Sequence, residues 1–133
     1  MKARIPTQKL PPLVLTYGFS GERKEKLSAL LQELALPERV IAPEEVGQPV
    51  GYLAGYPGFS MQEAAAPAAL EGECLLLSSL GDKQVDQLLA GLRRAGLSIP
   101  LKALTTPTNQ KWSFVQLVEH LEEERRFHAA QKK

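Results

Sequence analysis

Two short apolar stretches decide the fold: Leu13-Val14-Leu15-Thr16-Tyr17 and, further along, Cys74-Leu75-Leu76-Leu77-Ser78. Both are rich in the residues typical of buried strands. Each is followed by an amphipathic stretch, residues 21–36 and 82–96, and then by a second short apolar run, residues 40–42 and 101–104. The chain therefore contains one predicted strand–helix–strand unit twice.

A single offset of 61 residues superposes the two units. The offset matches Leu15 with Leu76, Leu27 with Leu88, Leu31 with Leu92, Phe19 with Leu80 and Ala42 with Ala103. Because the identities are all leucine or alanine, they indicate a shared pattern more than they demonstrate a duplication.

Each amphipathic stretch has one apolar stripe, with apolar residues at positions i, i+3, i+4 and i+7. The stripes are Leu27, Leu30, Leu31 and Leu34 in the first stretch, and Val85, Leu88, Leu89 and Leu92 in the second. A single stripe predicts a helix that covers one face of a sheet. Pro37 is expected to stop the first helix, and Gly96 to give the second a left-handed C-terminal cap.

A third helix is predicted to begin near Ser113, because Ser113 and Gln116 fit a capping box. Its stripe is Phe114, Leu117, Val118 and Leu121. We expect this C-terminal helix either to cover the open face of the sheet or to serve as a dimer arm. The connection between the two units is expected to hold a short helix within residues 44–54, starting near Gln48 because of Pro49, and a second capping box at Ser60 and Glu63.

The order βαββαβ predicts an α+β, ferredoxin-like sheet with its helices packed on one face, plus the additional C-terminal helix. A small α/β parallel sheet is the alternative. We expect a flexible lead-in over residues 1–12 and a single domain over 13–121, with halves 13–42 and 74–104 joined by a Gly/Ala-rich connection. We expect residues 122–133 to form a charged helix end and tail.

Composition excludes several classes of function. The chain has 133 residues with 16 Lys and Arg against 15 Asp and Glu, a net charge of +1, which argues against nucleic acid as a partner. We expect no membrane span, because no apolar run is long enough for one, and no secretory signal, because no apolar stretch follows the charges near residue 1. With a single cysteine, Cys74, a cytoplasmic location is expected.

The first candidate site is the glycine-rich segment 47–59, in which Gly47, Gly51 and Gly55 recur every fourth residue. On one helical face they would form a strip without side chains, with Tyr52 and Tyr56 as aromatic walls of a ligand or partner surface. Tight packing followed by a Tyr-Pro-Gly turn is the favoured alternative.

The second candidate site is the segment 102–112, which leaves the last strand and enters the last helix. Its hydroxyl, amide, basic and indole groups would hold a small anion or carboxylate. These groups belong to Lys102, Thr105, Thr106, Thr108, Asn109, Lys111 and Trp112. The alternative, slightly favoured, is a turn with helix-capping side chains and a tryptophan at the edge of the core.

No set of residues fits a catalytic site, a metal site or a cofactor. Cys74 opens an apolar strand and is expected to be a buried, inert thiol. His120 and His128 lie eight residues apart on the last helix, which is too far for a two-ligand metal pair.

The segments Val50-Gly51-Tyr52-Leu53-Ala54-Gly55-Tyr56-Pro57-Gly58-Phe59 and Leu104-Thr105-Thr106-Pro107-Thr108-Asn109-Gln110-Lys111-Trp112 together resemble a family of small bacterial proteins catalogued as a domain of unknown function. The resemblance covers roughly residues 13–121. It implies a bacterial, cytoplasmic protein and carries no activity.

The function hypothesis that follows is a non-enzymatic binding or regulatory module for a small anionic ligand or a partner protein. Homodimerisation through an open strand edge or the C-terminal helix is compatible with it. One alternative is a small enzyme acting on an anionic metabolite, with Lys102 or Thr106 in an active role. Another is an assembly subunit whose glycines serve packing only.

Overall fold

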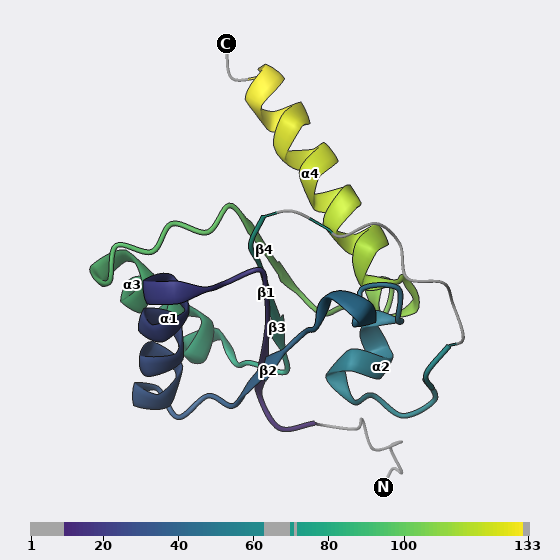
Figure 1. Ribbon diagram of the computed structural model, residues 1–133, viewed down its shortest axis with the longest axis horizontal. Coiled ribbons are helices and arrows are strands. Elements are labelled where there is room, and N and C mark those ends of the chain that lie inside the picture. Colours follow the sequence, from purple (N-terminus) through teal and green to yellow (C-terminus); the bar gives the residue numbers. More distant parts are fainter. Residues whose placement is uncertain (1–9, 63–69, 71, 132–133) are drawn as a thin grey trace, which may run out of the picture.

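The computed structural model describes residues 10–62, 70 and 72–131 (Figure 1). The strands are β1 (Leu13–Tyr17), β2 (Glu38–Val40), β3 (Cys74–Ser78) and β4 (Leu101–Leu104). The α-helices are α1 (Gly21–Glu33), α2 (Val50–Ala54), α3 (Asp82–Arg94) and α4 (Phe114–Gln131). Two 3-10 turns, η1 (Pro43–Glu45) and η2 (Asn109–Lys111), precede α2 and α4.

The strands form one mixed sheet of order β2-β1-β3-β4. Each strand–helix–strand unit pairs its own two strands in parallel, and the antiparallel pair β1–β3 joins the two units. In that pair Leu15 lies opposite Leu76, the residue with which the 61-residue offset matches it. The two units are therefore related by an approximate two-fold axis that passes through this leucine pair.

The α+β class is confirmed, but the ferredoxin-like strand order is not. In a split βαβ arrangement a strand of the other unit separates the two strands of each unit, whereas here β2 lies directly beside β1, and β4 beside β3. The long connection explains the difference, because η1 and α2 stand between β2 and β3 and no hairpin links those two strands. The all-parallel alternative is wrong, since β1 and β3 run antiparallel.

The helices match the repeat closely. Under the 61-residue offset, α1 over 21–33 and α3 over 82–94 start and end at equivalent positions. Gly96 has the expected left-handed backbone, with φ +71°. The equivalent residue of the first unit is Ala35, an exposed non-glycine residue that is also left-handed, with φ +59°.

The second strand lies earlier than predicted. It spans Glu38–Val40 rather than 40–42, because it begins directly after Pro37. In the sheet Leu15 pairs with Arg39, whereas Leu76 pairs with Ala103, so the predicted match of Ala42 with Ala103 is wrong. From a residue of the first strand to its partner on the second strand, the chain advances 24 residues in the first unit and 27 in the second. The connection is therefore three residues longer in the second unit.

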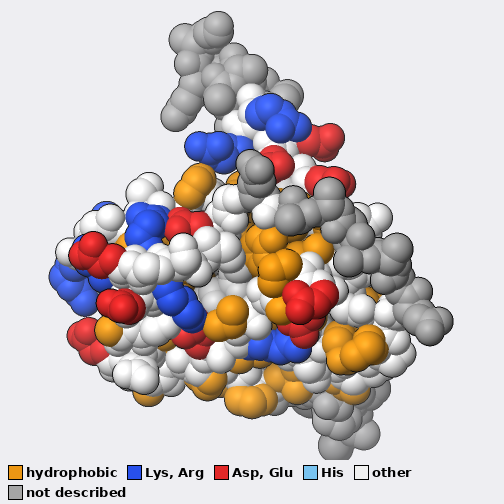
Figure 2. Space-filling model, in the orientation of Figure 1, with side chains coloured by type: hydrophobic (Ala, Val, Ile, Leu, Met, Phe, Trp, Pro, Cys, Tyr) orange, Lys and Arg blue, Asp and Glu red, His pale blue; other side chains and the backbone are white. Residues whose placement is uncertain are grey.

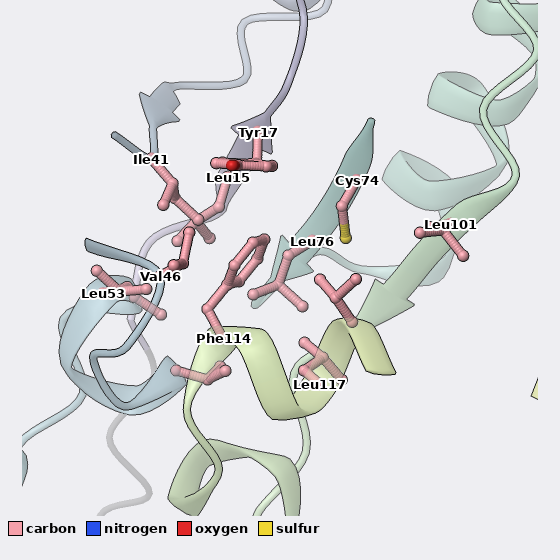
Figure 3. Close-up of a cluster of buried hydrophobic side chains, with 13 residues drawn as sticks. Leu15, Tyr17, Ile41, Val46, Leu53, Cys74, Leu76, Leu101, Phe114 and Leu117 are labelled. Atoms are coloured by element: carbon pink, nitrogen blue, oxygen red, sulfur yellow. The ribbon is translucent and has the colours of Figure 1, made fainter. Parts of the chain in front are cut away.

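Side chains alternate between the two faces of the sheet, as strand geometry requires. Val14, Leu75 and Leu77 pack against the leucine stripes of α1 and α3 on one face. Leu15, Tyr17 and Leu76 point to the other face, which α2 and α4 cover. Figure 3 shows this second core, with the ring of Phe114 directed between the strands and α2.

The first half of the C-terminal helix covers the sheet, which confirms the first of its two expected roles. Phe114, Leu117 and Val118 are buried. The capping box also forms: the Ser113 amide donates to Gln116 Oε1 at 3.0 Å, and the Gln116 amide donates to Ser113 Oγ at 3.2 Å. The second half of α4 extends away from the body (Figure 1).

The connection between the units is only partly described. The expected short helix exists as α2, which begins after Pro49. The expected capping box at Ser60 and Glu63 and the helix after it involve residues 63–69, which lie outside the described residues. Among the described helices, none combines the length and apolar character needed to cross a membrane.

Candidate functional site

The site lies at the carboxyl ends of β3 and β4. These two ends are side by side because the two strands are parallel. Ser78 is the last residue of β3, and Ser79 follows it with a left-handed backbone, φ +62°. Thr105 directly follows β4, and its amide donates to the Leu77 carbonyl at 2.9 Å. The strand ends thus present three hydroxyl groups together.

Tyr56 reaches the same edge from the glycine-rich segment. Gly55 ends α2 with φ +86°, and the Tyr56 amide then donates to the Gly51 carbonyl at 2.8 Å. The Tyr56 hydroxyl lies 3.0 Å from Thr105 Oγ1 and accepts a hydrogen bond from Ser78 Oγ at 3.2 Å. A longer contact of 3.5 Å joins it to Ser79 Oγ. We call Tyr56, Ser78, Ser79 and Thr105 the hydroxyl cluster.

The hydrogen bonds of the hydroxyl cluster affect the pKa of Tyr56. Partial burial alone would raise the pKa of Tyr56, but hydrogen bonds with Ser78, Ser79 and Thr105 outweigh it, so the pKa lies below that of a free tyrosine. Ser78 is buried whereas Ser79 is exposed, so the cluster opens to solvent on the Ser79 side. Sequence reasoning missed both serines; the signal was their place at the end of a buried strand.

The loop after Thr105 is held together by its own side chains. Asn109 Oδ1 accepts from the Thr106 amide at 2.8 Å, and the Asn109 amide donates to Thr106 Oγ1 at 3.0 Å. Asn109 Nδ2 donates to the Leu104 carbonyl at 3.0 Å, and the residue is only 7% exposed. Asn109 therefore shapes the loop that presents Thr105.

The two segments singled out in the sequence lie against each other. The Val50 amide donates to the Trp112 carbonyl at 2.8 Å, and the Phe114 amide donates to the Gln48 carbonyl at 3.0 Å. Pro49 and Ser113 form an isolated antiparallel bridge. These backbone contacts fix the position of α2 on the loop and so bring Tyr56 to Thr105.

The predicted glycine strip does not form on one helical face, because α2 holds only Gly51 of the three glycines. A Cβ at Gly51 would overlap the ring of Phe59, so this glycine allows close packing. Gly55 serves as the left-handed cap, and Gly47 precedes the helix. Tyr52 is half-buried and packs against the core beneath α2.

The remaining candidates of the loop do not join the hydroxyl cluster. The ring of Trp112 packs at a tilt of 54° against His120 of α4, with ring centroids 5.0 Å apart, beside a shallow hollow of about 280 Å³. Thr108 and Lys111 are exposed on η2 and its start. Lys102 lies on the other face of the sheet, where it lines a hollow beside α3.

Cys74 is the buried thiol that the sequence predicts. It is 2% exposed, and burial raises the pKa of the thiol to about 12, with a smaller contribution from the charge of Glu122. A thiol with so high a pKa is not a nucleophile at neutral pH.

Residues 73–127 match the model of a protein family described as a domain of unknown function (DUF3783). The expected resemblance to such a family is thereby confirmed for the second unit, the Thr105 loop and most of α4. The glycine-rich segment lies outside the matched residues. Comparison with curated proteins and with solved structures gives no match.

Proposed function

We propose that the protein is a non-enzymatic binding module that holds a small anionic ligand at the hydroxyl cluster. One observation supports the proposal above all others: the hydroxyl groups of Tyr56 and Thr105, which are 49 positions apart in the sequence, form a hydrogen bond at the carboxyl ends of two parallel strands. In sheets with parallel strands, ligands bind outside the carboxyl ends of those strands.

The chemistry of the cluster supports an anion rather than a cation. Against the opposing effect of burial, hydrogen bonds with Ser78, Ser79 and Thr105 lower the pKa of Tyr56, and the Ser78 hydroxyl donates to the Tyr56 oxygen. These contacts favour an anionic oxygen at this position. A carboxylate or phosphate oxygen close to Ser79 would accept the same kind of hydrogen bond. No cofactor is part of this proposal, and we place the module in the cytoplasm.

A thermal-shift screen against small carboxylates and phosphates tests the proposal. We expect at least one member of the panel to raise the melting temperature of the wild type and to lose this effect in the double variant Tyr56→Phe/Thr105→Val. Tyr52→Phe is the matched control, because it removes a tyrosine hydroxyl of the same segment outside the cluster. A panel without any hit, or a shift retained in the double variant, would contradict the proposal.

A further inference from the structure

A second surface, independent of the hydroxyl cluster, lies between the end of α3 and the edge strand β4. It is a hollow of about 520 Å³, within the range of small-molecule sites. Its apolar wall consists of Leu89, Leu92, Leu97 and Ile99, and its cationic side chains are Arg93 and Lys102. We call it the α3–β4 groove.

The longer return loop of the second unit builds this groove. Residues 95–100 connect α3 to β4, whereas the shorter stretch 34–37 connects α1 to β2. Leu97 and Ile99 of the longer loop are buried and supply part of the apolar wall. The groove is therefore a feature of the second unit rather than of the repeat.

Comparison of the two units shows what the groove lacks. By sheet register, Lys102 corresponds to Glu38, since Lys102 pairs with Leu75 and Glu38 with Val14. Glu38 is fully partnered: it accepts from Thr16 Oγ1 at 3.0 Å, Ser28 Oγ at 2.8 Å and Lys24 Nζ at 2.5 Å. The first unit thus completes its ion pair internally.

The second unit has no such internal pair among the described residues. The positions equivalent to Lys24 and Ser28 are Val85 and Leu89, which are apolar. Lys102 Nζ donates only to the Ile99 carbonyl, and a lysine ammonium has three donors. Ser98, which lines the groove, accepts at its carbonyl from Arg23 at 3.0 Å, and Arg23 also donates to both carboxylate oxygens of Glu73.

We infer that the α3–β4 groove binds an amphipathic anion, a small molecule with a carboxylate head and an aliphatic chain. The carboxylate head lies between Arg93 and Lys102. It supplies a negative charge of the kind that Glu38 of the protein supplies in the first unit. The aliphatic chain lies against Leu89, Leu92, Leu97 and Ile99 and is removed from water. Among the described residues, the groove is lined by two cationic side chains, by apolar side chains and by no carboxylate, which favours this occupant over a cationic or purely polar one.

Titration with decanoate, followed by amide chemical shifts of the full-length protein at neutral pH, tests the inference. We expect saturable changes concentrated at the end of α3, residues 95–100 and β4. Decanol, which has the chain without the charge, and acetate, which has the charge without the chain, should each bind at least several-fold more weakly. No saturable change with decanoate, or changes centred outside the groove, would overturn the inference.

Charge-removing variants give the second arm of the test. Arg93→Gln and Lys102→Gln should each weaken decanoate binding about two- to five-fold, as expected for a solvent-accessible ion pair. The matched control is Arg94→Gln, because Arg94 carries the same charge at the same helix end but lines a separate hollow toward α1. Unchanged affinity in the Arg93→Gln/Lys102→Gln double variant, with its spectrum showing a folded protein, would overturn the inference. Variants of Tyr56 and Thr105 should leave decanoate binding unchanged, so failure here is distinct from failure of the proposed function.

Discussion

At the scale of single residues, the repeat exposes one position where the first unit is under strain. Ala35 has φ +59°, while its equivalent in the second unit is glycine, with φ +71°. A left-handed conformation costs a residue with a Cβ about 1 kcal/mol relative to glycine. Pattern reasoning located the glycine cap but not its alanine counterpart, because alanine gives no sign of a left-handed backbone.

We predict that Ala35→Gly raises the free energy of unfolding by about 1 kcal/mol, less the entropy that glycine adds to the unfolded chain. Gly96→Ala should lower it by a similar amount, since a Cβ at Gly96 meets no other atom and only the backbone is strained. Urea denaturation of both variants measures the two changes. A decrease in stability for Ala35→Gly would show that the strain is not relieved.

Glu38 gives a prediction about acid stability. Burial raises the pKa of Glu38, but the hydrogen bonds of Lys24, Ser28 and Thr16 lower it by more, so the folded-state pKa lies below the ordinary value. A carboxylate of this kind stabilises the fold above its unfolded pKa of about 4.3, and the contribution is lost as the pH falls through the lower, folded-state pKa.

The variant Glu38→Gln should therefore lose stability at neutral pH and show a flatter decline of unfolding free energy below about pH 4.3. Denaturation curves measured across the acid range test this. Glu44→Gln is the control, because Glu44 is exposed in η1. Parallel pH profiles for the wild type and Glu38→Gln would contradict the assignment.

Tyr56 carries a spectroscopic prediction. Thr105→Val removes one of the hydroxyls that lower the pKa of Tyr56, so the pKa should rise. Ultraviolet titration of the phenolate band, with the Tyr56→Phe curve subtracted to isolate this residue, measures the change. A fall in the Tyr56 pKa, or no change, would contradict a hydrogen bond with Thr105 that lowers this pKa.

At the scale of elements, the helices were predictable because their leucine stripes are local patterns. The offset of 61 residues even places both helix starts correctly. The strand order was not predictable, since it depends on which long-range partner each short edge strand finds. The three residues Glu38–Val40 contain no sequence pattern that predicts pairing with β1 rather than with β3.

For the candidate site, too, local features were predictable and long-range contacts were not. The sequence identified both segments, and the structure brings Tyr56 and Thr105 together. Sequence reasoning made no prediction for Ser78 and Ser79. It also grouped Lys102 with the loop, although strand alternation puts Lys102 on the face opposite to Leu101 and Ala103. Tyr56 and Thr105 come together because α2 packs against the loop before α4. This packing is a tertiary contact that no local sequence pattern predicts.

Phe114 is the residue through which α4 is fixed to the sheet. It is completely buried and packs against Tyr17 with ring centroids 5.6 Å apart. We predict that Phe114→Ala lowers the free energy of unfolding by about 3–5 kcal/mol, the usual cost of truncating a buried phenylalanine. Trp112→Ala, a neighbouring aromatic that is only half-buried, should cost clearly less. Equal costs in thermal or urea denaturation would contradict the packing described.

At the scale of the whole molecule, two similar units share one sheet but differ in what their faces offer. One face is filled by α1 and α3, and the other by α2 and α4, so the sheet itself presents only its edges. The face shown in Figure 2 mixes acidic and basic side chains without a large area of one sign. The α3–β4 groove belongs to the second unit, and the hydroxyl cluster lies where the strands of that unit end, joined there by Tyr56 from the segment that follows α2.

Amide chemical-shift mapping on the wild-type protein, with the carboxylate or phosphate that gives the largest thermal shift, tests whether a small anion binds at the hydroxyl cluster. We predict that the largest changes fall together on Tyr56, Ser79 and Thr105, which come from three separate segments of the chain. Changes confined to one of these segments, or centred on another part of the surface, would contradict a ligand site at the hydroxyl cluster.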